Sequence, residues 1–243
     1  MDPEYGRRYR ELHRRHWWWR ARERVILDVV GELQPPGGFG HILDVGCGDG
    51  LLFPALAPLG EVEGIEPDEG LVSRAATPDG VIHVRPFDAS FRPGRAYGLM
   101  LMLDVLEHMD APDEAAAHAR ELLEPGGSLV VTVPAFRSLW TQHDVLNEHR
   151  TRYSRAEIVR LLRDAGLEVG RARYLFRWLV PAKVAVRAKE AVLGGEPRPP
   201  TLPPAPLNRI LYGLTRMEEG LLGRVPLPFG TSVLAVARRP IGA

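Results

Sequence analysis

One segment in the first quarter of the chain limits the fold more than any other. It is a short apolar stretch followed by a turn with glycine at every second position: His41-Ile42-Leu43-Asp44-Val45-Gly46-Cys47-Gly48-Asp49-Gly50. Glycine adopts positive φ readily and lets a ligand approach the backbone closely. A strand, a glycine turn and a helix in this order present free N–H groups at the turn and the helix start. The segment therefore predicts a nucleotide site in an α/β domain, and the alternative is an ordinary turn at a strand end.

The glycine spacing separates two kinds of nucleotide site. A dinucleotide fingerprint places its third glycine at position 51, where this chain has Leu51, and the third glycine here is Gly50. Asp44, just before the turn, repels a pyrophosphate and suits a cationic ligand. The pattern therefore disfavours a nicotinamide enzyme.

Charge and cysteine content exclude several classes. Lysine plus arginine and aspartate plus glutamate number 31 each, so no basic field favours nucleic acid, and we expect no nucleic-acid partner. Cys47 is the single cysteine, which rules out an intrachain disulfide and fits a reducing cytoplasm. No apolar run reaches the roughly 18 residues of a membrane span, and the polar, arginine-rich N-terminus does not look like a secretory signal. We expect a cytoplasmic protein.

Apolar periodicity and turn residues predict alternating strands and helices, and hence a parallel sheet wound on both faces. The expected strands are 42–45, 61–66, 81–85, 97–103, 128–133, 167–172 and 231–237, with a turn at 125–127. The expected helices are 9–33, 51–59, 114–123 and 154–165, the last with a Ser154/Glu157 capping box. The expected organisation is a helical cap at 1–34, a core at 35–174, an insertion at 175–229 and a last core strand at 230–243. Within the insertion, a basic amphipathic segment (176–193) and a helical segment (208–222) flank a proline-rich linker (194–206).

Two further strand ends carry candidate ligand groups. Glu66, followed by Pro67, ends the second strand about 20 residues past the first glycine, where a carboxylate can accept hydrogen bonds from both ribose hydroxyls. The alternative is a solvated strand-end acid. After the third strand, Asp88 can accept from an adenine amino group beside Ala89, and Phe87 can pack on the ring; a plain loop acid fits nearly as well.

These residues, together with the run Asp104-Val105-Leu106-Glu107-His108-Met109 after the fourth strand, resemble motifs I and IV of the class I S-adenosylmethionine-dependent methyltransferases. The resemblance covers roughly residues 40–135, with Gly98 where the family usually has an acid. It implies a Rossmann-like doubly wound sheet of about seven strands, mostly parallel with an antiparallel last strand, and S-adenosylmethionine as cofactor. The implied cofactor residues are Asp44, Gly46, Cys47, Gly48, Gly50, Glu66, Pro67, Phe87, Asp88, Ala89, Asp104, Val105 and His108. Cys47 fits best there as a small apolar filler.

A second resemblance points to a bacterial subgroup of these enzymes, of the methyltransferase type 11, 12 and 23 kind. It rests on residues 16–22 (HWWWRAR), 134–144 (PAFRSLWTQHD) and 149–153 (HRTRY), with Trp19 where phenylalanine is common and Thr151 where arginine is common. In that subgroup the first helix lies over the cofactor. Three adjacent tryptophans cannot all face one core, so we expect at least one to face the cofactor pocket or a partner; alternatively two are core and one is surface.

The stretch 134–153 follows the fifth strand, at the sheet edge where ligands bind. Histidine has a pKa suited to taking a proton from a methyl acceptor. We expect His143 to be that base, with Asp144 or His149 as its orienting partner. His108 fits better as a structural residue at a helix start, and we expect no metal site, because no two of these residues have the i,i+4 spacing of helical ligands.

The expected function is methyl transfer from S-adenosylmethionine to an oxygen or nitrogen of a small or lipid-like metabolite. A non-catalytic cofactor-binding or regulatory module on the same fold is the alternative. For the insertion 175–229, the open alternatives are a cover over the acceptor, contact with a membrane surface, a lid and a homodimer interface.

Overall fold

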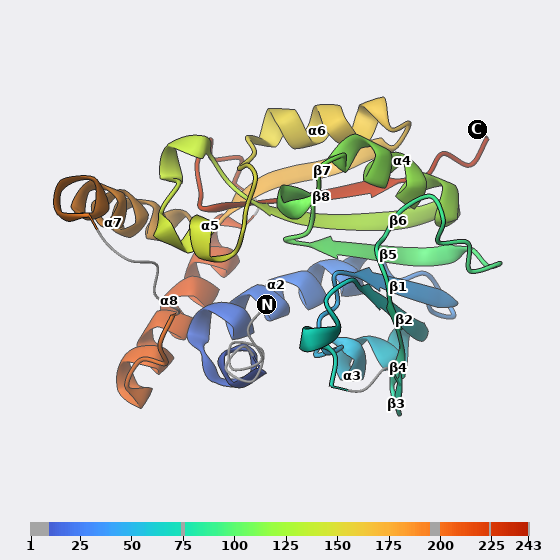
Figure 1. The fold of residues 1–243 in the computed structure, drawn as a ribbon, viewed down its shortest axis with the longest axis horizontal. Helices are drawn as coiled ribbons and strands as arrows, with labels where there is room; N and C mark the ends of the chain where they lie inside the picture. Colours follow the sequence, from blue (N-terminus) through green and yellow to red (C-terminus); the bar gives the residue numbers. More distant parts are fainter. Residues whose placement is uncertain (1–9, 74–75, 195–199, 224, 243) are drawn as a thin grey trace.

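The computed structural model describes residues 10–73, 76–194, 200–223 and 225–242, which form one eight-stranded sheet between two layers of helices (Figure 1). The strand order is β3-β4-β2-β1-β5-β6-β8-β7. The strands are β1 (His41–Val45), β2 (Glu61–Glu66), β3 (Ala76–Thr77), β4 (Gly80–Val84), β5 (Tyr97–Leu103), β6 (Leu123–Pro134), β7 (Glu168–Leu175) and β8 (Ser232–Arg238). β1, β2, β4, β5 and β6 pair in parallel, and β8 runs antiparallel between β6 and β7. The predicted fold class is confirmed, with β3 as a two-residue addition at one edge.

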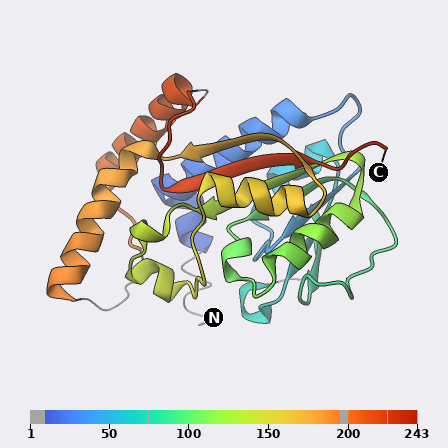
Figure 2. The ribbon, with the colours of Figure 1, turned by 90° about the horizontal axis from the view of Figure 1, so that it is seen from above.

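The helices fall on both faces of the sheet (Figures 1 and 2). α4 and α6 cover one face and α2 and α3 the other. The α-helices are α2 (Trp17–Leu33), α3 (Phe53–Leu56), α4 (Pro112–Leu122), α5 (Gln142–Leu146), α6 (Arg155–Asp164), α7 (Val180–Leu193) and α8 (Ala205–Leu222). Short 3₁₀ turns are η1 (Ala57–Leu59), η2 (Glu69–Leu71), η3 (Leu106–His108), η4 (Arg137–Leu139) and η5 (Arg177–Leu179).

Alternation along the central strands builds two cores, one on each face of the sheet. Met100 and Met102 of β5 pack toward α4 and α6, whereas Leu99 and Leu101 pack toward α2 and α3. All four side chains are completely buried. A strand with both faces covered needs an unbroken apolar run, because successive side chains point to opposite faces. This requirement explains the run Leu99–Leu103 in the sequence.

Some element boundaries differ from the sequence prediction. The expected helix 9–33 is interrupted at His16, whose Nδ1 accepts a hydrogen bond from the Trp18 N–H (3.1 Å) and caps α2. The expected helix 51–59 begins at Phe53, because Pro54 fits only in a first helical turn. The expected turn 125–127 lies inside β6, where the pairing with β5 slips between Tyr97 and Leu99. The capping box of Ser154 and Glu157 is formed as predicted.

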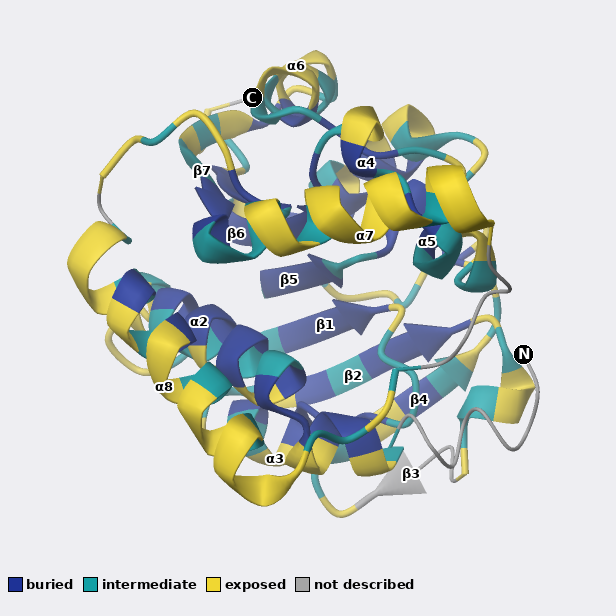
Figure 3. Cartoon of the chain, turned by 90° about the vertical axis from the view of Figure 1, so that its left-hand side faces the viewer, coloured by how far each residue is buried: buried dark blue, intermediate teal, exposed yellow. Residues whose placement is uncertain are grey.

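The insertion packs against α2 and not only against the sheet edge. α8 packs along α2, and the two lie side by side in Figure 3. Asn208 accepts from the Trp17 N–H and donates to the Arg15 carbonyl, both at 2.8 Å, and Arg216 pairs with Asp28 at 3.1 Å. α7 has no buried residue (Figure 3). The predicted linker 194–206 falls partly outside the described residues, and the domain boundaries stay predictions.

No helix among the described residues is both long enough and apolar enough to cross a bilayer.

Close packing explains why position 98 is a glycine. A Cβ built on this β5 residue would lie 2.2 Å from the carbonyl oxygen of Phe39, and backbone cannot move aside as a flexible side chain can. The acid that the resemblance places at this position therefore does not fit here. The loop before β1 occupies the space instead.

We predict that Gly98→Ala lowers the free energy of unfolding by about 1–3 kcal/mol, the usual cost of overpacking. Gly170→Ala is the matched control, because Gly170 also lies in a strand but its Cβ position has no atom within 4 Å. Urea unfolding of both variants measures the difference. Equal midpoints for the two would contradict this account of Gly98.

Candidate cofactor and acceptor site

The glycine turn after β1 has the backbone conformation that its sequence predicts. Gly46, Gly48 and Gly50 have φ of +70°, +54° and +65°. A Cβ on Gly46 would lie 2.6 Å from Val105 Cγ2, so this position packs against the end of β5. A Cβ on Gly48 would have no atom within 4 Å. The turn thus has an open cradle at Gly48, into which a ligand can approach the backbone.

Glu66 lies beside this turn at the end of β2. Its carboxylate accepts hydrogen bonds from the backbone N–H groups of Gly48 and Asp68, both at 3.0 Å. Burial raises the pKa of Glu66, and these two N–H groups oppose the increase. Each carboxylate oxygen keeps a second lone pair, so the group can still accept from ribose hydroxyls. The structure brings Glu66 and the glycine turn together; a ribose contact stays a prediction.

Asp44 is buried beneath the same turn. Burial raises its pKa to about 7, the Arg22 charge opposes this, and Glu66 adds to it. Cys47 lies between the glycines with its pKa raised mainly by burial, which fits a packing role rather than a nucleophile. Pro67 follows Glu66 at the surface.

The end of β5 completes this side of the site. Asp104 has a φ of +58°, which is unusual for a residue with a side chain, and its N–H donates to the Thr132 carbonyl. Arg22 of α2 donates to Asp104 Oδ2 (2.8 Å) and to Thr132 Oγ1 (3.0 Å), and Thr132 Oγ1 donates to Asp104 Oδ1. Arg22 is buried, and its guanidinium lies 5.8 Å from the Trp18 ring centroid. This network ties α2 to the edge of the sheet.

Sequence reasoning did not single out Arg22 or Thr132. Arg22 stood in the HWWWRAR motif, six residues past the helix cap, and this was the only available signal. Of the three tryptophans, Trp17 and Trp19 are buried and Trp18 is half-buried against Trp19 and Phe176. Neither expected alternative describes Trp18 fully, because it lines the junction between α2 and the insertion.

The three residues predicted to contact adenine lie in different environments. Phe87 is buried, with its ring 5.0 Å from the His118 ring and 6.3 Å from the Phe91 ring. The ring thus packs in the core, and its contact with adenine stays a prediction. Asp88 is exposed and accepts from the N–H and Oγ of Ser90, and Ala89 is also exposed. An adenine contact at Asp88 stays a prediction.

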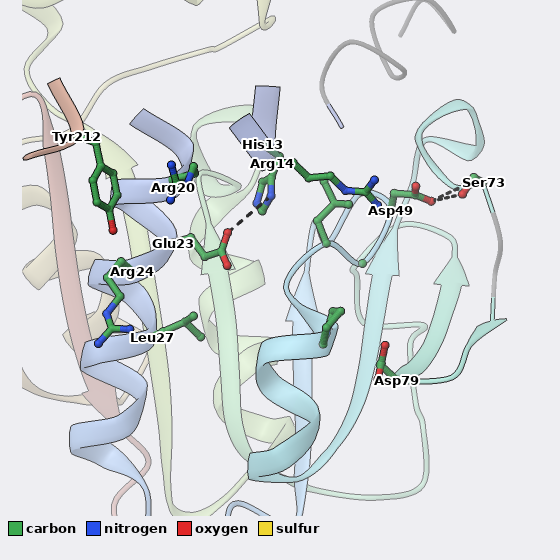
Figure 4. Close-up of a pocket in the computed structure, with 13 residues that line it drawn as sticks. His13, Arg14, Arg20, Glu23, Arg24, Leu27, Asp49, Ser73, Asp79 and Tyr212 are labelled. Atoms are coloured by element: carbon green, nitrogen blue, oxygen red, sulfur yellow. Dashed lines mark hydrogen bonds and ion pairs between the residues drawn. The ribbon is translucent and has the colours of Figure 1, made fainter. Parts of the chain in front are cut away.

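A cavity of about 630 Å³ lies between α2 and the glycine turn (Figure 4). Its walls include Arg20, Glu23 and Arg24 from α2, and Asp49 and Gly50 from the turn. Asp49 accepts from Arg10 Nη1 at 3.1 Å and from the N–H and Oγ of Ser73, both at 2.7 Å. Arg10, which precedes α2, and Ser73, in the loop after β2, therefore both bind the turn.

In α5, Asp144 is completely buried and is held by three residues. It accepts from Arg152 Nε (2.7 Å) and Nη2 (3.0 Å), from His149 Nδ1 (2.8 Å) and from the Thr141 N–H (2.8 Å). Burial alone would raise the pKa of Asp144, but these hydrogen bonds and the Arg152 charge bring it well below its usual range. Asp144 is therefore an ionised structural anchor.

The structure does not pair His143 with Asp144, one of the two orienting partners expected for it. His143 Nε2 instead lies 3.1 Å from Asn147 Nδ2, and Asp144 is engaged by Arg152, His149 and Thr141. Burial and then the Lys183 charge lower the pKa of His143 to about 4. Neighbours on a helix point about 100° apart, so adjacency in sequence does not make contact. His149 is the histidine that Asp144 orients.

Three hydrogen bonds clasp residues 149–153 to the turn after β5. The Arg150 N–H donates to the Glu107 carbonyl and Arg150 Nε to the His108 carbonyl, both at 2.8 Å. Tyr153 Oη donates to the Leu106 carbonyl at 3.1 Å. These hydrogen bonds bring the His108 and His149 rings together, with their centroids 4.9 Å apart. Both line a cavity of about 440 Å³ with Trp140, Val145, Glu148 and Arg150.

We predict that Asp144→Asn lowers the free energy of unfolding at pH 7 by about 3–5 kcal/mol, because Arg152 is left as a buried charge without its partner. Asp110→Asn, which breaks an exposed pair with Arg150, should cost about 0–1 kcal/mol. The folded pKa of Asp144 is depressed, so its contribution is complete above the unfolded value of about 3.9.

That contribution is lost as the pH falls below about 4 toward the lower folded pKa, and the gap between wild type and Asp144→Asn should narrow there. Urea unfolding at pH 7 and at more acid pH measures both effects. Equal losses for Asp144→Asn and Asp110→Asn at pH 7 would remove Asp144 as the anchor.

The comparisons with known proteins agree with this geometry. The model of the methyltransferase-domain family matches residues 18–171. The ubiquinone biosynthesis O-methyltransferase of Caulobacter vibrioides is 29% identical over 175 residues, which are 64% of this chain and 58% of that protein. This chain thus aligns with less than two thirds of that relative.

Two solved structures share the fold. A methyltransferase in complex with the Haloferax volcanii Trm112 methyltransferase activator superposes with a TM-score of 0.62 at 19% identity, over 98% of this chain and 95% of that one. The [4+2]-cyclase SpnF superposes with a TM-score of 0.60 at 21% identity, over 93% and 83%. The glycine turn, the carboxylates that end β2 and β5 and the family match place this chain in the methyltransferase-domain family, with the fold of the class I S-adenosylmethionine-dependent methyltransferases.

Proposed function

We propose that this protein transfers a methyl group from S-adenosylmethionine to an oxygen or nitrogen atom of a small or lipid-like acceptor. The observation that carries the proposal is that the sheet edge holds two separate groups of residues. The open cradle at Gly48 lies beside Glu66, and the Asp144–His149 pair borders a separate cavity next to the end of β5. A transferase needs such a division between donor and acceptor.

The residues of the first group fit the cofactor. The open space at Gly48 lets the cofactor approach the turn backbone, and Glu66, which the Gly48 N–H already fixes, suits its ribose. Asp104 and Val105, next to Gly46, would border its methionine portion, and Arg22 holds Asp104 in place. When bound, S-adenosylmethionine supplies a methyl group on a positively charged sulfur. The protein's main contribution is to align this group with the acceptor.

The residues of the second group suit the acceptor. Because His149 Nδ1 lies 2.8 Å from the ionised Asp144, the N–H is held on that nitrogen and Nε2 keeps its lone pair. Such a nitrogen can take a proton from an acceptor hydroxyl or amine. His149 therefore replaces His143 as the proposed base, with Asp144 as its positioning residue.

The name of the Caulobacter relative favours oxygen as the acceptor atom. The balanced charge favours a neutral small molecule or lipid over nucleic acid. Exposed apolar side chains of α8, among them Leu207, Ile210 and Met217, are compatible with a lipid-like acceptor, a membrane surface or a second copy of the chain. The rival function is a non-catalytic cofactor-binding or regulatory module, because a fold does not determine a function; SpnF, which shares the fold, is named as a cyclase.

We predict that Gly48→Ala weakens S-adenosylhomocysteine binding at least tenfold, about 1.4 kcal/mol, because the new methyl group occupies the space that the ligand needs. Gly40→Ala is the matched control: its φ is +68°, its Cβ position is equally open, and it lies before β1. Calorimetry on both folded variants measures the affinity. NAD serves as a negative ligand, and saturable NAD binding without S-adenosylhomocysteine binding would overturn the cofactor assignment.

We predict that His149→Ala lowers turnover about a hundredfold while cofactor affinity stays within a few fold, because the proton acceptor is lost but the cradle is intact. His143→Ala should change turnover by only a few fold. The assay follows labelled methyl groups from S-adenosylmethionine into polar and lipid extracts. The His149→Ala defect should shrink at high pH, where the acceptor ionises unaided. No methyl transfer by wild type into any extract would favour the non-catalytic alternative.

A further inference from the structure

Three side chains from two distant segments converge beside the acceptor cavity. One ligand atom each from Glu107, His108 and His149 lies within 4.8 Å of the other two. Within the part of the chain that the structure describes, no other group of three histidine, cysteine or acidic side chains is gathered this closely. Glu107 and His108 belong to η3, and His149 follows α5.

Glu107 is the decisive member. Its side chain is completely buried, and neither carboxylate oxygen has a hydrogen-bond partner among the described residues. A buried carboxylate without partners is costly, so such groups are normally paired or coordinate a metal. One nitrogen of each of the two imidazoles lies within 4.8 Å of a carboxylate oxygen, whereas Arg22 and Arg152 act on Glu107 through their charge without a hydrogen bond to it. A single cation could be shared by all three side chains.

Neighbouring groups already hold His149 and the two segments in position to bind a cation. The Nδ1 of His149 is held by Asp144, and Arg152 fixes Asp144 in turn. A metal-binding histidine commonly donates its second ring N–H to a carboxylate in this way. The Arg150 clasp to the carbonyls of Glu107 and His108 fixes the spacing between the two segments. Ligand positions that are held before the ion arrives favour binding.

We propose that Glu107, His108 and His149 bind one divalent transition-metal ion, with zinc the best match. Two imidazoles and one carboxylate are a donor set that zinc prefers, whereas magnesium and calcium prefer oxygen ligands alone. Zinc ligands lie about 2.0–2.2 Å from the ion, which needs the three atoms to close by about 1 Å. Three protein ligands leave a fourth position, and His108 and His149 both border the acceptor cavity.

The sequence predicts no metal site, because its candidate ligands lack i,i+4 spacing. His108 and His149 are far apart in the sequence, and only the clasp brings them together. One consequence rests on the proposed methyl transfer. With an ion bound, an acceptor hydroxyl in the open position would lose its proton more easily and His149 would be a ligand; without the ion, His149 keeps its proposed role as the base.

The test uses the tag-free, full-length protein after chelator treatment, without cofactor or acceptor. Cobalt(II), a coloured substitute for zinc, is titrated and followed by its visible absorption. Zinc content is then measured after gel filtration, and thermal unfolding is compared with and without zinc. We expect one ion per chain and a higher Tm with zinc, because an ion that binds only the folded state stabilises it.

His108→Ala and Glu107→Gln should each weaken cobalt binding at least tenfold and abolish the zinc-dependent rise in Tm. His108 is exposed, so its variant should fold, and Glu107→Gln keeps the shape of the side chain while removing its charge. His41→Ala, at a surface histidine paired with Glu61 on another part of the sheet, should bind as wild type does.

Failure of wild type to bind cobalt or zinc would overturn the proposal, as would binding that both variants retain. Neither result touches the cofactor assignment, which the Gly48→Ala experiment decides separately. Conversely, metal binding without any methyl transfer would leave the site intact and remove only its proposed role toward the acceptor.

Discussion

The proposed acceptor side of this molecule depends on one buried carboxylate. Asp144 cannot be solvated where it lies, so its charge must be met by protein groups. Arg152, His149 and the Thr141 N–H supply them and, in doing so, fold residues 141–152 into a fixed loop around one point. The orientation of His149, the position of Arg150 and the cavity between them all follow from this interaction. A buried ion pair contributes little net stability, but it strongly disfavours arrangements that leave either charge unpaired.

On the proposed donor side, carboxylates at two strand ends play a similar part. Glu66 accepts from the glycine turn that follows the neighbouring strand, and Asp104 accepts from Arg22 of the covering helix. Each carboxylate therefore links its own strand to a second element. α2 is fastened to Asp104 and Thr132 and also packs against α8, so it links this edge of the sheet to the insertion.

The insertion acquires its role through these contacts. Asn208 and Arg216 attach α8 to α2, while α7 remains exposed. Lys183 of α7 donates to Thr141 Oγ1 (3.0 Å), and Arg187 donates to the Trp140 carbonyl (2.7 Å). The insertion thus touches both the helix that covers the donor site and the loop that borders the acceptor cavity. Substrate choice is commonly determined by such peripheral elements.

Local pattern determined much of this protein. Glycines that need positive φ, an apolar run for a doubly covered strand and an acid at a strand end are short-range requirements. Each can be recognised along the chain, and together they predicted the sheet, the turn at Gly46–Gly50 and the place of Glu66. The capping box of Ser154 was predictable for the same reason.

Only the tertiary structure decided which side chains meet across long distances. Asp144 contacts His149 and not its neighbour His143, because the two neighbours point in different directions from a helix. Arg22 reaches Asp104, and Glu107 and His108 reach His149, because the crossovers of the sheet bring their segments to one edge. Phe87 lies in the core because Phe91 and His118 surround it. Sequence spacing does not predict these contacts, because they depend on how the elements pack in three dimensions.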